Sequence, residues 1–151
     1  MLASLKVKDY MSANKYKFTP DMDILRAIHQ MIEARISGAP VIDQRGNMIG
    51  FLSEKDCMQV ALNSAYQQDG AAGQVSEYMT KNVDTIDVET PIIDVAELFL
   101  KGSYKLFPVI TDNRLVGTIT RQNILRALED ISTPDSGKKS AKQSTVQKIH
   151  V

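Results

Sequence analysis

An internal repeat constrains the fold of this chain more than any other feature of its sequence. Residues near the start recur 68 positions later, in the pairs Val7 and Val75, Tyr10 and Tyr78, Met11 and Met79, and Asn14 and Asn82. The same spacing relates Pro40-Val41-Ile42 to Pro108-Val109-Ile110, and after one lost residue a spacing of 67 relates Gly50 to Gly117. Matches that keep their order with a single gap indicate a duplicated fold unit. We expect two half-units of about 60 residues that are marginal alone and share an interface.

Composition and charge narrow the class of protein. With 151 residues and 43% hydrophobic content, the chain can bury a core as one or two small units. Its 18 basic residues balance 18 acidic ones, which argues against nucleic acid as a partner. The single cysteine, Cys57, excludes an internal disulfide and a multi-cysteine metal site. Apolar runs fall well short of the ~20 residues of a membrane span, and residues 1–6 lack the layout of a signal peptide. We therefore expect a cytoplasmic protein without membrane insertion.

The sequence pattern of each half predicts the same order of elements, namely strand, helix, strand, strand and helix. This order is an α/β (α+β) fold. The first strands are short and follow lead-in segments: Lys15–Thr19 after Val7–Met11, and Val83–Asp87 after Val75–Met79. The paired strands are apolar runs around short polar loops: Ala39–Asp43 with Met48–Leu52, and Phe107–Thr111 with Leu115–Thr120. Such spacing is typical of β-hairpins.

Apolar residues at helical spacing predict the first helix of each half, beginning near Ile24 and near Ile92. Capping residues mark the starts: Asp21 or Asp23 in the first half, and Thr90 with Pro91 at the first helical position in the second. Gly38 and Gly102 stand near the two helix ends, where a left-handed residue is often needed.

The repeat boundaries divide the chain into four segments. We expect a first repeat at 7–66, a polar and Gly-rich linker at 67–74, a second repeat at 75–131 and a flexible basic tail at 132–151. The tail combines Ser, Thr, Pro and Gly with several lysines, and no acid follows Asp135. Two other interpretations stay open, a basic arm for a partner or phosphate, and an edge strand over Thr145–Val151 that docks in a dimer.

The last strand of each half runs into a hydroxyl residue, followed three positions later by Asp or Asn: Ser53 with Asp56, and Thr120 with Asn123. One interpretation is a capping box that starts the second helix. The other is ligand recognition, because a helix start offers free N–H groups and a positive dipole end to a phosphate. An acid one turn in can accept hydrogen bonds from a ribose diol. A hydroxyl plus an acid suits a nucleoside phosphate better than bare phosphate.

These motifs resemble a known family. The order of an apolar helix, Gly-Ala-Pro-Val-Ile-Asp, a short turn and Gly-Phe-Leu-Ser-Glu-Lys-Asp is similar to a cystathionine-beta-synthase (CBS) domain. The second copy, from Leu-Phe-Pro-Val-Ile-Thr to Gly-Thr-Ile-Thr-Arg-Gln-Asn, is similar too. Together they resemble a tandem CBS pair over roughly Val7 to Asp130. The resemblance implies two β-α-β-β-α half-units packed about a pseudo-twofold axis, and a homodimer of such pairs.

The resemblance also implies adenine-containing ligands in clefts between the repeats: AMP, ADP, ATP or S-adenosylmethionine. The family motif places phosphate or ribose at Ser53 and Thr120 and the ribose hydroxyls at Asp56 and Asn123. It lines the adenine pocket with Ala39, Pro40, Phe107 and Pro108, and closes it with Phe18, Thr85 and Ile86. No cofactor is required, and neither catalytic nor metal-binding residues are implied.

Three residues depart from the family pattern. Asn123 stands where an acid is usual, so its ribose contact lacks charge. Arg121 beside it favours phosphate. Lys17 stands where a small hydroxyl residue is frequent, matched by Thr85 in the second copy. We therefore expect one good site and one weak or empty site.

The leading hypothesis is a stand-alone regulatory module that binds an adenosyl ligand and signals to an effector protein in trans. The alternative is a ligand-free CBS dimer that acts as an interaction scaffold. We do not expect an enzyme, since the sequence lacks a nucleophile–base pair or a metal cluster. The thiol of Cys57, near a helix start, could have a lowered pKa or be a small apolar side chain.

Overall fold

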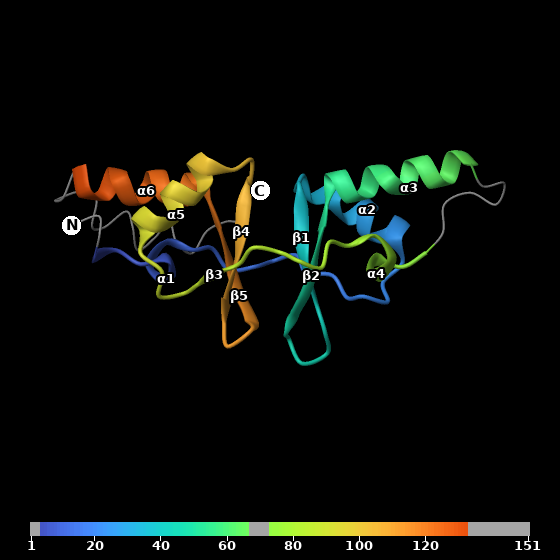
Figure 1. Cartoon of the computed structure of the whole chain (residues 1–151), viewed down its shortest axis with the longest axis horizontal. Coiled ribbons are helices and arrows are strands. Elements are labelled where there is room, and N and C mark those ends of the chain that lie inside the picture. Colours follow the sequence, from blue (N-terminus) through green and yellow to red (C-terminus); the bar gives the residue numbers. More distant parts are fainter. Residues whose placement is uncertain (1–3, 67–72, 133–151) are drawn as a thin grey trace. The chain divides into compact units, whose positions relative to one another are not determined.

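The computed structural model of the chain describes residues 4–66 and 73–132. Most of the expected linker and all of the expected tail beyond Ser132 lie outside these residues. Figure 1 shows helices α1, α2, α3, α4, α5 and α6, and strands β1 to β5. The helices span Val7–Tyr10 (α1), Ile24–Ala34 (α2), Glu54–Tyr66 (α3), Val75–Tyr78 (α4), Ile92–Lys101 (α5) and Arg121–Ser132 (α6). The strands span Gly38–Ile42 (β1), Met48–Ser53 (β2), Ile86–Asp87 (β3), Leu106–Thr111 (β4) and Arg114–Thr120 (β5).

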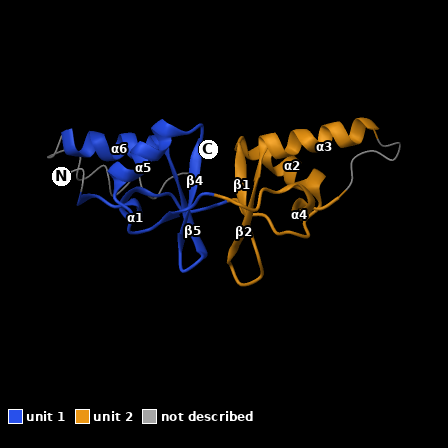
Figure 2. Ribbon diagram, in the orientation of Figure 1, with its two compact units in different colours: residues 1–15, 84–149 blue, residues 16–83, 150–151 orange. Residues whose placement is uncertain are grey.

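The described residues form two compact units, which do not coincide with the two sequence repeats (Figure 2). Unit 1 holds residues 4–15 and 84–132, and unit 2 holds 16–66 and 73–83. Helix α1, which begins the first repeat, therefore belongs with the body of the second. Helix α4, which begins the second repeat, belongs with the body of the first. The two lead-in segments are exchanged between the repeats.

Unit 2 is built on the antiparallel hairpin of β1 and β2, whose register runs from Gly38 opposite Ser53 to Ile42 opposite Met48. The predicted strand over Lys15–Thr19 is reduced to a parallel bridge between Phe18 and Val41. Phe18 N–H donates to the Pro40 carbonyl, and Phe18 O accepts from Ile42 N–H, both at 2.9 Å. Pro20 follows two residues later and has no N–H to extend a ladder.

Unit 1 has a three-stranded sheet in the order β3-β4-β5. The predicted strand over 83–87 is confirmed for Ile86 and Asp87, which pair in parallel with Val109 and Ile110. Strands β4 and β5 pair antiparallel around a two-residue turn in which Asp112 and Asn113 have φ of 50° and 65°. Asp and Asn tolerate this left-handed conformation, which matches the twist of a tight hairpin.

The helix ends confirm one capping prediction and correct two others. Asp23 caps α2, accepting from Arg26 N–H at 3.0 Å. The predicted cap at Thr90 is wrong, because Thr90 N–H donates to Asp87 O within a turn and Pro91 is the extended N-cap of α5. The left-handed role predicted for two glycines is also wrong. Gly38 begins β1 and Gly102 is extended, with φ −119°, whereas the left-handed residue after α2 is Arg35, with φ 56°.

Each unit has its own apolar core, and each core includes a valine from an exchanged lead-in helix. Val7 of α1 is fully buried with Ile92, Val109 and Ile119 in unit 1. Val75 of α4 is fully buried with a second set in unit 2: Phe18, Ile24, Val41 and Leu52. Full burial of a valine is worth about 1.5–3 kcal/mol. The exchange is therefore stabilised by packing within each unit.

Polar contacts also hold the lead-in helices. Tyr10 O–H of α1 donates to Asp130 Oδ2 of α6 at 2.7 Å, and at the repeated positions Asn63 Nδ2 donates to Tyr78 OH at 3.3 Å. Each contact joins the tyrosine of a lead-in helix to the last helix of the other repeat, within one unit, α1 to α6 in unit 1 and α4 to α3 in unit 2. Within the described ranges, no helix combines the length and apolarity needed to cross a bilayer.

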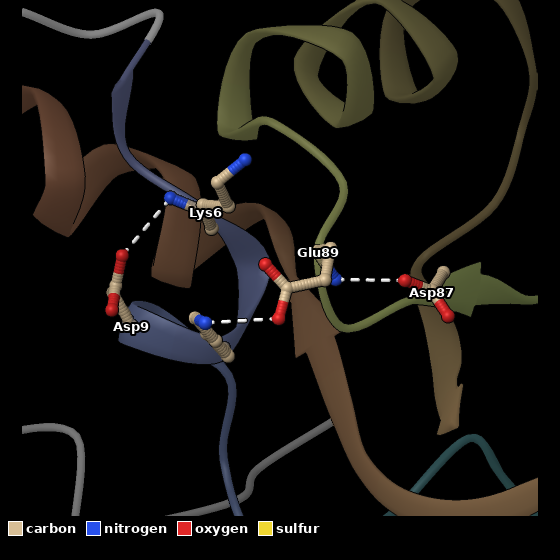
Figure 3. Close-up of polar contacts among 5 residues, drawn as sticks. Lys6, Asp9, Asp87 and Glu89 are labelled. Atoms are coloured by element: carbon tan, nitrogen blue, oxygen red, sulfur yellow. Dashed lines mark hydrogen bonds and ion pairs between the residues drawn. The ribbon is translucent and has the colours of Figure 1, made fainter. Parts of the chain in front are cut away.

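Figure 3 shows how α1 lies beside the segment between β3 and α5. Lys8 Nζ forms an ion pair with Glu89 Oε2 at 2.9 Å, and Glu89 N–H donates to Asp87 Oδ2 at 2.9 Å. The hydrogen bond and charge of Glu89 raise the pKa of Lys8. Lys6 N–H donates to Asp9 Oδ2 at 3.0 Å and starts the helix. Since the ion pair is half exposed, it positions α1 more than it stabilises the unit.

Candidate functional site

The strand-to-helix turn of unit 2 is closed by a reciprocal pair of hydrogen bonds. Strand β2 ends at Ser53 and α3 begins at Glu54. Ser53 N–H donates to Asp56 Oδ2 at 2.9 Å, and Asp56 N–H donates to Ser53 Oγ at 3.1 Å. The turn is thus a capping box, as one interpretation of the sequence predicts. Because Ser53 Oγ is the acceptor in this pair, its own O–H is left to donate to a ligand.

The residue that follows the exchanged lead-in segment Val75–Met79 completes this turn. Thr80 Oγ1 donates to Asp56, at 3.0 Å from Oδ1 and 3.2 Å from Oδ2. Thr80 is held there by two backbone hydrogen bonds of 2.9 Å to Phe51. Gly50 makes the approach possible, since a Cβ there would lie 3.0 Å from Thr80 O and 2.6 Å from Met79 Sδ. The carboxylate of Asp56 is therefore fixed from two sides.

The turn of unit 1 has the same geometry with different chemistry. Asn123 Oδ1 accepts from Thr120 N–H at 2.8 Å and from Thr120 O–H at 3.1 Å. Asn123 Nδ2 donates to Ser12 Oγ at 3.4 Å. Ser12 takes the place of Thr80, and its backbone pairs with Thr118 in both directions at 2.9 Å. A Cβ at Gly117 would lie 2.5 Å from Ser12 O, so glycine is needed here too.

The two turns differ in how many further hydrogen bonds their Asp or Asn side chain can accept. An ionised carboxylate has about four lone-pair sites and an amide oxygen two. At Asp56 the bonds from Ser53 and Thr80 leave acceptor capacity on both oxygens. At Asn123 the two bonds from Thr120 use both lone pairs of Oδ1, and only an Nδ2 hydrogen is left to donate. A diol that donates two hydrogen bonds is therefore matched by Asp56 and not by Asn123.

The first residue of each helix sets the local charge. Glu54 begins α3, so its first turn carries two acids, Glu54 and Asp56. The repeated position in α6 is Arg121, which is exposed, and the first turn of that helix has no acid. A phosphate is repelled by the first arrangement and attracted by the second.

The alternation of the strands assigns the predicted adenine-pocket residues to opposite faces. Four of them belong to the two cores and are at most 5% exposed: Phe18, Ala39, Ile86 and Phe107. The prolines face the other way. Pro40 lies opposite Phe51, and Pro108 lies opposite Thr118. These prolines thus share a sheet face with Ser53 and Thr120, and Thr85 is half-buried just before β3.

The ring of Phe107 has two aromatic neighbours in unit 1. Its centroid lies 4.8 Å from those of both Phe99 and Tyr104. Tyr104 O–H donates to Asp84 Oδ2, and this hydrogen bond raises the pKa of Tyr104. The contact links the segment before β3 to the one before β4.

Sequence reasoning did not single out Ser12 and Thr80. They directly follow the lead-in segments, far along the chain from the amide and carboxylate that they contact. A signal was present, because the spacing of 68 that relates the lead-in segments also pairs Ser12 with Thr80, both hydroxyl residues.

Cys57 has no features of an activated nucleophile. Burial, and then the charges of Asp56 and Glu54, raise the pKa of its thiol to about 11. Its Sγ contacts Met31 Sδ at 3.9 Å in the core region of unit 2. The small apolar interpretation of this residue is therefore favoured. Across residues 4–66 and 73–132, no group of three or more His, Cys, Asp or Glu side chains could hold a metal ion.

Comparisons with known proteins identify a family for both repeats and sequence relatives that align with most of the chain. The family model for the CBS domain matches residues 7–63 and 75–130. An uncharacterized 17.7 kDa protein of Acidianus ambivalens is 28% identical over 134 residues, which are 88% of this chain and 79% of that protein. An A-adding tRNA nucleotidyltransferase of Aquifex aeolicus is 26% identical over 126 residues, but this chain spans only 15% of that enzyme. A segment similar to this chain thus makes up most of one relative and a small part of a much longer enzyme.

Solved structures share the fold. CBSX2 of Arabidopsis thaliana, in complex with AMP, has a TM-score of 0.73 and 26% identity, over 84% of this chain and 98% of that one. The CBS domain pair of protein MJ0100, in complex with 5′-methylthioadenosine and S-adenosyl-L-methionine, has a TM-score of 0.67 and 26% identity, over 82% and 99%. The resemblance and the mixed α/β fold that the sequence predicts are confirmed. The chain belongs to the CBS domain family and carries two CBS repeats.

Proposed function

We propose that this chain is a regulatory module that binds an adenine nucleotide or a related adenosyl compound at its strand-to-helix turns. The observation that carries the proposal is the Asp56 carboxylate, which is fixed by Ser53 and Thr80 and keeps unused acceptor capacity. Two similar CBS-pair structures contain AMP or S-adenosyl-L-methionine, which supports an adenosyl ligand here.

In this proposal Asp56 accepts hydrogen bonds from a ribose diol while the Ser53 O–H and the start of α3 donate to the next polar group of the ligand. The turn of unit 2 is the stronger ribose site, because Asn123 has little acceptor capacity left. The turn of unit 1 contributes phosphate affinity through Arg121. In this proposal the good ribose contact is at Asp56 and the weak one at Asn123, a choice that the sequence leaves open.

Regulation follows from coupling between the ligand and the arrangement of the chain. A ligand shifts an equilibrium between two arrangements only by its differential affinity for them. A hundredfold difference is about 2.7 kcal/mol, enough to reverse a tenfold bias. We propose that an effector protein in the cytoplasm reads the resulting state.

We also propose that the protein forms a homodimer through its second helices. Met58 of α3 and Leu125 of α6 occupy repeated positions, and both side chains are 62% exposed. Leu62 and Leu128 extend these apolar surfaces. The same apolar position displayed twice suits a symmetric partner, namely a second copy of the chain. Multi-angle light scattering of the Met58→Glu and Leu125→Glu double variant should give the monomer mass, and a wild-type monomer would contradict the dimer.

A thermal-shift screen tests the ligand proposal. AMP, ADP, ATP and S-adenosylmethionine are each added to the full chain at rising concentration. A ligand at 100 times its dissociation constant stabilises the folded state by about 2.7 kcal/mol. We expect at least one to raise the melting temperature, and Asp56→Ala to weaken that response more than Asn123→Ala. If no adenosyl compound moves the transition, the proposed function is wrong.

A further inference from the structure

The first long helix of each unit, α2 in unit 2 and α5 in unit 1, displays apolar side chains to solvent at the same two positions. Leu25 and Ile32 of α2 are 48% and 66% exposed, and Ile93 and Leu100 of α5 are 39% and 86% exposed. The repeat spacing of 68 relates Leu25 to Ile93 and Ile32 to Leu100. Because residues seven apart lie on one side of a helix, each helix has an outward apolar face besides the one that enters its core.

Exposed polar residues flank these apolar positions, and their charges are opposite in the two helices. The spacing of 68 sets a basic residue of one helix against an acidic residue of the other at three positions: Arg26 with Asp94, His29 with Glu97, and Glu33 with Lys101. Across residues 4–66 and 73–132, none of these side chains forms an ion pair. The outer face of α2 is therefore complementary in charge to the outer face of α5, position by position.

We propose that the homodimer pairs α2 of each copy with α5 of the other copy, side by side and running in the same direction. The inference rests on the proposed homodimer and adds which elements meet in it. Arg26 then lies opposite the partner's Asp94, and Glu33 lies opposite the partner's Lys101. In a twofold dimer this contact occurs twice, so the outward apolar faces of α2 and α5 are covered in both copies.

The arrangement of helices within each unit fits this interface. Cys57 Sγ of α3 contacts Met31 Sδ of α2 at 3.9 Å, and α5 packs against α6 in unit 1 (Figure 1). The exposed side chains of Met58 and Leu125 belong to α3 and α6. An interface that includes these second helices can therefore reach the first ones as well.

The charges disfavour the other ways of pairing these helices, because like charges that face each other across an interface repel. If α2 met the partner's α5 in the opposite direction, Arg26 would face the partner's Lys101. Glu33 would then face the partner's Asp94. If α5 met the partner's α5 antiparallel, Glu97 would face the partner's Glu97 at the centre, and in a parallel pair every like charge would meet. A parallel pair of α2 and α5 sets opposite charges against each other at all three positions.

Two charge-reversed variants of the full chain test the pairing by analytical ultracentrifugation. One carries Arg26→Asp and Glu33→Lys in α2, and the other carries Asp94→Arg and Lys101→Glu in α5. In either variant alone, α2 and the partner's α5 have like charges at both positions, so we expect the dimer to be about 100-fold weaker than in the wild type. A mixture of the two variants restores opposite charges at every contact. The mixture should therefore form a heterodimer with nearly the wild-type affinity, and the weakening in each variant should shrink at high salt.

The outcomes separate this inference from the proposed homodimer. An antiparallel pairing of like helices keeps its attraction in each variant, because position 26 still meets an opposite charge at position 33. Variants that dimerise as the wild type does would therefore overturn the inference, as would weakened variants that do not recover on mixing. If thermal melting shows that a double variant does not fold, the milder pair Arg26→Glu and Asp94→Arg applies the same mixing test. If the wild-type chain is a monomer, the homodimer fails together with this inference.

Discussion

Replacing Asp56 by asparagine separates ligand binding at the unit 2 turn from helix capping. Asn123 of unit 1 already demonstrates that an amide can hold this geometry, accepting from Thr120 N–H at 2.8 Å and donating to Ser12 Oγ at 3.4 Å. An asparagine at position 56 can make the equivalent bonds to Ser53 and Thr80. The change therefore removes a charge and acceptor capacity while the backbone contacts stay in place.

The magnitude follows from the lost charge. A hydrogen bond to a charged group contributes about 1.5–3 kcal/mol and a neutral one about 0.5–1.5 kcal/mol. Losing about 1–1.5 kcal/mol from one ribose contact weakens binding about tenfold. In the ligand-free protein, the lost interaction of Asp56 with the positive end of α3 costs about 0.3–1 kcal/mol. The free energy of binding should therefore fall more than the free energy of unfolding.

Calorimetric titration with the ligand from the screen, together with urea unfolding, measures both quantities. The matched control is Asp23→Asn in the same unit, since Asp23 also caps a helix and its carboxylate accepts from Arg26 N–H at 3.0 Å. The control should lose a similar amount of stability and bind the ligand as the wild type does. Wild-type affinity in Asp56→Asn would refute the reasoning and leave Asp56 as a capping residue alone.

Three other predictions concern packing and ionisation. Gly117→Ala should destabilise the protein by about 1–3 kcal/mol in urea unfolding, because its methyl would lie 2.5 Å from the backbone oxygen of Ser12. Gly50→Ala should cost less, since its shortest contact, 2.6 Å, is to a flexible methionine sulfur. Burial, and then a carboxylate hydrogen bond, raise the pKa of Tyr10 above its ordinary value of 10.0. Stability should therefore be intact below about pH 10 and fall as the pH rises further, and Tyr10→Phe should flatten that fall. With its pKa raised to about 11, the thiol of Cys57 should react slowly with iodoacetamide at pH 8 and much faster after unfolding. Fast labelling of the folded chain would contradict this.

Local patterns predicted much of each repeat. The expected hairpin Phe107–Thr111 with Leu115–Thr120 differs by one residue at two ends from β4, Leu106–Thr111, and β5, Arg114–Thr120. Alternating apolar residues and a two-residue turn set these boundaries within a few positions of the chain. The capping boxes at Ser53 and Thr120 were likewise readable from three-residue spacings.

The exchange of the lead-in segments could not be predicted in the same way. It depends on contacts between distant residues, such as Val7 N–H with Thr90 O at 2.9 Å, and the four-residue helix α1 gives no sign of the unit it will join. The predicted cap at Thr90 failed because that residue's N–H forms a turn with Asp87. Propensity at a single position does not decide between a cap and a turn.

Because the lead-in segments are exchanged, the residue beside each proposed ligand-binding turn continues along the chain into the other unit. Thr80 bonds Asp56 through its side chain and Phe51 through its backbone, yet it continues within five residues into the segment that leads to β3 of unit 1. Ser12 holds the same position for Asn123 and continues into unit 2. A ligand at the Asp56 carboxylate therefore lies beside Thr80, and the chain that follows Thr80 enters the other unit at Asp84. Coupling requires a two-state element that both sites bias, and we propose the segments that follow Ser12 and Thr80 for this role because each passes from one unit into the other.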